Sequence, residues 1–131
     1  MGTDEAQDDP SIKDDDVVWR RVPWISVTYK NGRPEAQSGA FNDSSDGTPM
    51  SVDIASLCTS ARESMGICDG GLVELRVGDL REQGFGVLRH PEAGNRAHAY
   101  VTGKKSSGKR RRIARLAKWK IEPPPNSPER S

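Results

Sequence analysis

The chain has 131 residues, of which 33% are hydrophobic, with 20 Lys or Arg against 19 Asp or Glu. This size and composition fit one small domain with tails and argue against two domains or a membrane-spanning protein. The near-neutral total conceals one cationic run, residues 103–121, which holds nine Lys or Arg and no acid, so that the rest of the sequence has 11 basic and 19 acidic residues.

Residues 1–16 contain seven acids, one Lys and almost no apolar side chains. Such a segment buries too little surface to offset its chain entropy, so we expect a disordered acidic arm. It also lacks the apolar core of a secretory signal. We therefore expect a soluble, cytoplasmic protein with no membrane partner.

The first ordered segment is predicted at residues 17–29, where β-branched and aromatic residues dominate. Pro23 either divides this segment into two short strands or kinks a single edge strand. Asn31-Gly32 predicts a tight turn. A long loop is expected at residues 33–49, which are rich in Ser, Gly, Asp, Asn and Pro, with Phe41 as its anchor.

A first helix is predicted at residues 51–65, where apolar residues recur at helical spacing from Ile54 to Met65. Ser51 would cap its start and Gly66 would end it. The following patterns predict, in order, a strand at 72–77, a helical turn at 79–84, a strand at 85–88, a turn at 90–95 and a strand at 97–102.

The cationic run is expected to form a polar loop at 103–108 and a second helix at 109–121, which the prolines at 123–125 would end. Ile113 and Ile121 would lie on its apolar side, whereas Arg111, Arg115 and Lys118 would lie on the opposite side. Residues 123–131 would be a disordered Pro/Ser-rich tail.

These elements predict an α+β fold: three to five short strands in a mostly antiparallel or mixed sheet, packed by two helices. The expected organisation is an acidic disordered arm at 1–16, one domain at 17–122, and a tail at 123–131. No internal repeat is present in the sequence.

The cationic run indicates a partner that carries phosphate, since clustered cations attract polyanions. Trp119 is a candidate for stacking on a base. The candidate phosphate-binding or nucleic-acid-binding residues are Lys104, Lys105, Lys109, Arg110, Arg111, Arg112, Arg115, Lys118 and Trp119.

Residues 103–109 also match the pattern G-x-x-x-x-G-K of phosphate-binding loops. Arg110 stands where the Ser or Thr that holds Mg²⁺ is required, and too few residues follow for the rest of a nucleotide-hydrolysing fold. A weaker hypothesis remains, in which backbone N–H groups and Lys109 bind a single phosphate.

No complete catalytic motif is present, but His98, with Asn95 and Arg96 beside it, is a candidate acid or base. Cys58 and Cys68 are expected to be reduced thiols. Their spacing from each other and from the two histidines does not fit zinc fingers, so we expect neither a metal ion nor a cofactor.

The function that the sequence favours is a small non-enzymatic accessory module that contacts the phosphates of RNA or DNA through the basic loop and helix. One alternative is a small enzyme acting on nucleotides or RNA with His98 as acid and base. Another is a protein–protein adaptor whose basic helix docks on an acidic subunit.

Overall fold

The structure is a computed structural model that describes residues 6–125. Its strands are β1 (Val17–Val22), β2 (Val27–Lys30), β3 (Arg33–Ala36), β4 (Met50–Ile54), β5 (Gly71–Arg76), β6 (Gly86–Arg89), β7 (His98–Thr102) and β8 (Lys118–Ile121). The α-helices are α1 (Ala61–Met65), α2 (Val77–Glu82) and α3 (Ser107–Leu116), and the 3-10 turns are η1 (Trp24–Ser26), η2 (Ser38–Phe41) and η3 (Ala55–Leu57). No helix of this described part has the length and apolar character to span a bilayer.

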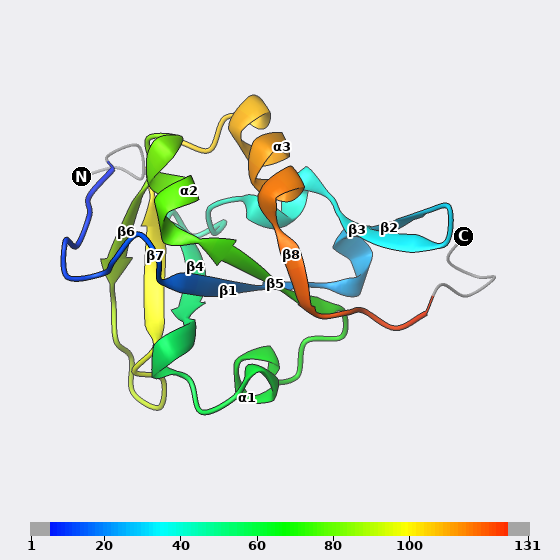
Figure 1. Ribbon diagram of the computed structural model, residues 1–131, viewed down its shortest axis with the longest axis horizontal. Helices are drawn as coiled ribbons and strands as arrows, with labels where there is room; N and C mark the ends of the chain where they lie inside the picture. The colour runs from blue at the N-terminus through cyan, green and yellow to red at the C-terminus, as the bar shows by residue number, and fades with distance from the viewer. Residues whose placement is uncertain (1–5, 126–131) are drawn as a thin grey trace.

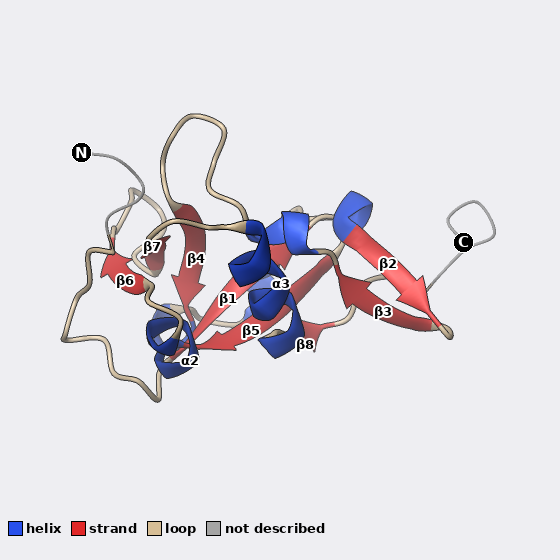
Figure 2. Cartoon of the chain, turned by 90° about the horizontal axis from the view of Figure 1, so that it is seen from above, coloured by secondary structure: helices blue, strands red, loops and turns tan. Residues whose placement is uncertain are grey.

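Six strands form one sheet in the order β6-β7-β4-β1-β5-β8, and every neighbouring pair is antiparallel. Strands β2 and β3 form a separate hairpin that projects beyond this sheet (Figures 1 and 2). The prediction of an α+β fold is confirmed, and of the two kinds of sheet expected, mostly antiparallel or mixed, the structure has the antiparallel one. The predicted number of strands was too low, because β3, β4 and β8 fall in segments expected to be loop or helix. The predicted number of helices was also too low, because the turn expected at 79–84 lies largely in a third α-helix, α2, among residues 6–125.

The two faces of the large sheet are covered unequally. Helices α2 and α3 lie on one face, and α1 lies on the other (Figure 1). The main core, under α2 and α3, contains the fully buried side chains of Leu80 and Ile113, together with Phe41 from η2. A smaller cluster beneath α1 contains Trp19, Met65 and Leu72.

The helix predicted at 51–65 is wrong in its first half. Residues 50–54 form β4, which pairs with both β1 and β7. Met50, Val52 and Ile54 alternate along this strand and all contribute to the main core. Only the end of the predicted helix is helical: Ser60, not Ser51, caps α1 by accepting the Glu63 N–H at 3.1 Å, and Gly66 ends it as expected. Hydrogen bonds from β4 to strands on both sides stabilise the extended backbone more than the helical spacing of the apolar residues favours a helix.

The second predicted helix was drawn too long at its C-terminal end. Helix α3 ends at Leu116, and the chain then extends as β8, so the prolines at 123–125 do not stop the helix. Strand β8 pairs with the free edge of β5, where Trp119 lies opposite Val73. Hydrogen bonds to this open edge stabilise the extended backbone, and they move Lys118 and Trp119 off the helix.

The local predictions for the first two strands, the turn after them and the anchor of the following loop are confirmed. Strands β1 and β2 are separate and flank Pro23, as one of the two alternatives predicted. Asn31 and Gly32 have φ values of 54° and 78°, the left-handed pair that joins β2 to β3 in a tight hairpin. Phe41 anchors the loop after β3, with 0% of its surface exposed.

The acidic arm is the largest departure from expectation, because residues 6–16 are packed rather than disordered. The Asp9 N–H donates to the Val87 carbonyl at 2.9 Å, and the Val87 N–H donates to the Asp8 carboxylate at 2.9 Å. Ile12 is only 4% exposed and belongs to the main core. The arm therefore covers the outer edge of β6 (Figure 1), which protects an edge strand from pairing with another chain.

The expected C-terminal tail is described only at residues 123–125, where Pro123 is buried. The remaining residues of both predicted disordered segments, 1–5 and 126–131, lie outside the described residues.

We predict that Ile12→Ala lowers the free energy of unfolding by about 2–3 kcal/mol, because it removes a buried side chain from the core. Ile25→Ala is the matched control, since Ile25 is 76% exposed; its effect should stay within about 0.5 kcal/mol. Urea unfolding monitored by tryptophan fluorescence measures both. Equal stability of the two variants would show that the arm does not pack in solution.

Candidate functional site

Helix α3 has a strongly one-sided character. Ile113 is fully buried in the main core, while Lys109, Arg111, Arg112 and Arg115 are exposed. The helix begins after Ser106, whose hydroxyl oxygen accepts the Lys109 N–H at 3.3 Å. The first turn contains no acid. Lys109 lies in the first turn, at the positive end of the helix dipole, where a cation is unfavourable by a few tenths of a kcal/mol, whereas Arg115 lies in the last turn, where the dipole favours a cation.

A groove of about 510 Å³ runs along this exposed side of α3. Glu82 and Gln83, from the end of α2, form its other wall. Four cations line the groove, namely Lys109, Arg111, Arg112 and Arg115. Within residues 6–125 none of these four forms an ion pair with a carboxylate. We call these four residues and the space between them the α3 groove.

Three acids in the described part of the N-terminal arm form ion pairs away from the α3 groove. Arg81 of α2 pairs with Asp14 at 2.7 Å and with Asp8 at 3.2 Å. Arg76, at the end of β5, pairs with Asp15 at 3.2 Å. The described part of the arm therefore pairs with arginines around α2 and leaves the α3 groove positive.

Lys105 is held inside the protein and is not available to a phosphate. Its ammonium donates to the Asp43 carboxylate at 2.8 Å and to the carbonyls of Val101 and Gly103, each at 2.7 Å. Burial lowers the pKa of Lys105, although the charge of Asp43 opposes that shift. The Gly103 carbonyl of the loop and the Val101 carbonyl of β7 thus point at a cation, whereas a phosphate-binding loop points N–H groups at an anion. This arrangement argues against the single-phosphate hypothesis at residues 103–109.

Two arginines reinforce the region around Asp43. Arg20 donates to the Ser51 carbonyl at 2.7 Å and to the Ala40 carbonyl at 3.1 Å. Burial, together with the charge of neighbouring Arg21, lowers the pKa of Arg20 to about 10, so it stays charged at neutral pH. Arg110 of α3 donates to the side-chain oxygen of Asn42. Arg110 is therefore also a structural contact between α3 and the loop after η2.

The sequence reasoning missed the structural roles of Arg20 and Asp43. A charged residue in the middle of an otherwise β-branched strand, as Arg20 is in β1, was a signal that it needed buried partners. Asp43 gave no comparable signal, because it lies in a loop rich in polar residues.

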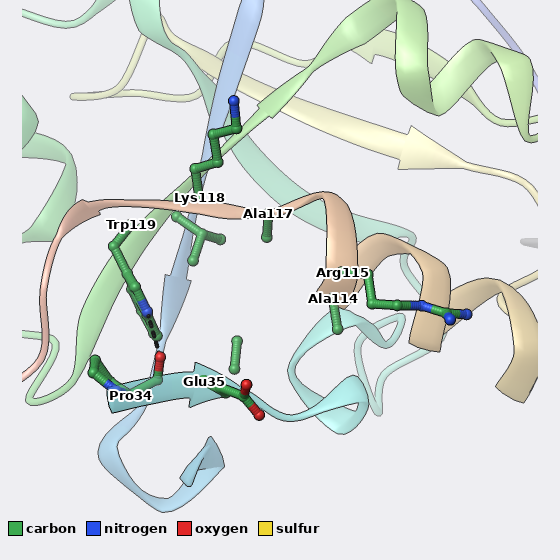
Figure 3. Close-up of a pocket in the computed structure, with 9 residues that line it drawn as sticks. Pro34, Glu35, Ala114, Arg115, Ala117, Lys118 and Trp119 are labelled. Atoms are coloured by element: carbon green, nitrogen blue, oxygen red, sulfur yellow. Dashed lines mark hydrogen bonds between the residues drawn. The ribbon is translucent and has the colours of Figure 1, made fainter. Parts of the chain in front are cut away.

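Trp119 does not lie in the α3 groove. Its indole N–H donates to the Pro34 carbonyl at 3.0 Å, and Figure 3 shows the ring pointing toward Pro34 of the hairpin. A second hollow of about 530 Å³ lies here, between β3 and the junction of α3 with β8. Arg115 borders both hollows, and Lys118 lines only the second. The Trp119 side chain therefore connects the β2–β3 hairpin to β8.

The candidate catalytic residues meet only in part. Asn95 and Arg96 line a hollow of about 380 Å³, and His98 does not. Asn95 is tied into the turn before β7: its amide donates to Asp53 at 2.9 Å, and its oxygen accepts the Ala97 N–H at 3.1 Å. Arg96 is exposed. His98 is 6% exposed, and its Nε2 lies 3.1 Å from the Ser51 hydroxyl.

Both cysteines are free and border the smaller cluster with Trp19 and Met65. Burial raises the pKa of the Cys58 thiol, and its Sγ donates to the Ile54 carbonyl at 3.5 Å. Among the described residues the two thiols do not join the histidines in a cluster of metal ligands.

Comparison of this chain with protein-family models, with curated proteins and with solved structures finds no match.

We predict that Lys105→Met lowers the free energy of unfolding by about 3 kcal/mol, because it leaves the Asp43 carboxylate and two carbonyls without their donor. Lys104→Met is the control: Lys104 is the neighbouring residue and is exposed, so its substitution should change stability by less than about 0.5 kcal/mol. Thermal unfolding of both variants measures their difference in stability. A Lys105→Met protein as stable as Lys104→Met would contradict the buried assignment.

Proposed function

We propose that this protein is a small non-enzymatic accessory module that binds the phosphate backbone of RNA or DNA in the α3 groove. The observation that carries the proposal is the set of four groove cations without an ion pair in residues 6–125. A row of phosphates would neutralise these cations and release counterions, which is the main source of affinity in such complexes.

The structure narrows the set of residues proposed for binding. Lys109, Arg111, Arg112 and Arg115 form the groove, and the exposed Lys104 and Lys118 flank it along the chain. Lys105, Arg110 and Trp119 make the internal contacts described above, so they support α3 and its surroundings instead of touching phosphate. The groove holds no aromatic ring to stack on a base, which favours contacts to the backbone over readout of sequence.

The lining of the groove also favours nucleic acid over an acidic protein subunit. Its other residues are Glu82, Gln83, Ser106 and Gly108, so no apolar side chain lines it. Stable protein–protein interfaces usually concentrate their affinity in buried aromatic or aliphatic anchors. A wholly polar, cationic groove suits the evenly spaced charges of a phosphodiester chain better.

We infer a cytoplasmic location as well. The support is chemical: Cys58 and Cys68 are both free, and unpaired thiols persist in reducing compartments.

The contact between Ser51 and His98 is the one observation that favours the rival enzyme hypothesis. A hydroxyl beside an imidazole is the starting arrangement of many nucleophiles. However, neither Ser51 nor His98 lines the α3 groove, the hollow beside Trp119 or the hollow at Asn95 and Arg96, although Glu92 in the last of these lies 3.7 Å from His98 Nδ1. Turnover of RNA or nucleotides by the wild type that is lost in His98→Ala would favour this rival.

We predict that Arg111→Glu combined with Arg115→Glu weakens binding to single-stranded RNA and duplex DNA at low salt by at least tenfold. The plot of log affinity against log salt concentration should also become shallower by about 2, because two phosphate contacts are lost. Fluorescence anisotropy with labelled oligonucleotides at two or more salt concentrations gives both values.

The control is Lys30→Glu combined with Arg62→Glu, which makes the same change in net charge at exposed cations of β2 and α1. This control should keep most of the affinity. Equal losses in the two double variants would mean that overall charge, not the groove, drives binding. Absence of binding by the wild type at low salt would overturn the proposal, and preference for polyglutamate over both nucleic acids would favour the adaptor.

A further inference from the structure

A cluster of potential metal ligands lies at the turn between β6 and β7. Within residues 6–125, His90, Glu92 and His98 are the group whose ligand atoms lie within 4.8 Å of one another. The two Nδ1 atoms are 3.3 Å apart, and the Glu92 Oε2 atom is 3.8 Å from His90 Nδ1 and 3.7 Å from His98 Nδ1. The three atoms therefore form a nearly equilateral triangle.

This triangle has the dimensions of one face of a tetrahedral metal site. Zn²⁺ binds histidine nitrogen and carboxylate oxygen at about 2.0–2.2 Å, so two of its ligands in tetrahedral geometry are about 3.3–3.6 Å apart. We propose that His90, Glu92 and His98 bind a divalent transition-metal ion of the zinc type, with water as the fourth ligand. Two histidines and one carboxylate suit such an ion better than Mg²⁺ or Ca²⁺, which prefer oxygen ligands.

Contacts with Tyr100 and Ser51 orient the imidazole rings of His90 and His98 without a metal ion. The Tyr100 ring packs against His90, with centroids 4.5 Å apart, and against His98, with centroids 5.0 Å apart. The Ser51 hydroxyl lies 3.1 Å from His98 Nε2, the nitrogen that faces away from the cluster. Such a partner on the second nitrogen is the usual companion of a metal-bound histidine, because it orients the ring.

The backbone of the turn is equally well fixed. The Glu92 N–H donates to the Asn95 carbonyl at 3.0 Å, and the Asn95 N–H donates back to Glu92 at 2.9 Å. The bond from Asn95 to buried Asp53 then attaches the turn to β4. Asn95 therefore positions the turn that carries two of the three ligands, His90 and Glu92.

Metal binding requires one rearrangement of protons. His98 Nδ1 lies 2.8 Å from the His90 carbonyl oxygen, so without an ion it carries a proton and donates there. In the metal-bound form this proton leaves Nδ1, and Nε2 carries one instead and donates to Ser51. The hydrogen bond from Nδ1 to the His90 carbonyl is then lost.

The test uses untagged full-length protein in which Cys58→Ser and Cys68→Ser remove the competing thiols. Calorimetric titration with Zn²⁺ should show one equivalent bound, and Co²⁺ should give the intense visible bands of a tetrahedral site. His90→Ala and Glu92→Gln, which alter exposed residues and should fold normally, are expected to weaken Zn²⁺ binding by more than tenfold. Zn²⁺ should raise the melting temperature of the parent but not of His90→Ala.

Glu122→Gln, at another exposed acid, is the control and should bind Zn²⁺ as the parent does. Two results would overturn the proposal: no Zn²⁺ binding by the parent, in which the cysteines are already replaced, or full binding by both His90→Ala and Glu92→Gln. None of these results bears on the α3 groove, since His90, Glu92 and His98 do not line it.

Discussion

The buried ammonium of Lys105 is the contact on which the arrangement of the basic segment depends. It joins two separate pieces of chain: the loop after η2, through Asp43, and the segment that leads from β7 to α3, through the carbonyls of Val101 and Gly103. Burying a lysine is costly unless its charge and all its donors are satisfied, and here each donor has a partner. Because this contact fixes where α3 leaves the sheet, it also determines which side of the helix meets solvent. The Arg110–Asn42 bond holds the helix from a second point.

The charges of this protein are separated in space as well as in sequence. Three described acids of the arm, Asp8, Asp14 and Asp15, pair with Arg76 and Arg81 around α2, and the same arm protects the edge of β6. The exposed cations of α3 therefore have no acid of the arm as a counter-ion among the described residues. A protein with a net charge of only +1 can in this way present a strongly positive groove. Such separation orients the molecule as it approaches a polyanion, which raises the rate of productive encounter.

Local patterns were enough for many elements of the fold. The Asn31-Gly32 turn, the Phe41 anchor and the succession from β5 through α2 to β6 all follow from residues close together in sequence. The failures at β4 and β8 have a common cause. In a short apolar stretch, helical spacing and strand alternation select many of the same residues, so the pattern is ambiguous. Pairing with β1 and β7 makes residues 50–54 a strand, and pairing with the edge of β5 makes residues 118–121 a strand.

The sequence alone sufficed to locate the cationic run, the antiparallel α+β class and most of the turns, because composition and turn chemistry act over a few residues. Only the tertiary structure separates Lys105, which is buried, and Arg110, which is bonded to Asn42, from the exposed cations of α3, because these contacts depend on partners such as Asp43, 62 residues away from Lys105. The same holds for His90, Glu92 and His98. Their spacing along the chain matches no familiar metal motif, and the pairing of β6 with β7 brings their ligand atoms together.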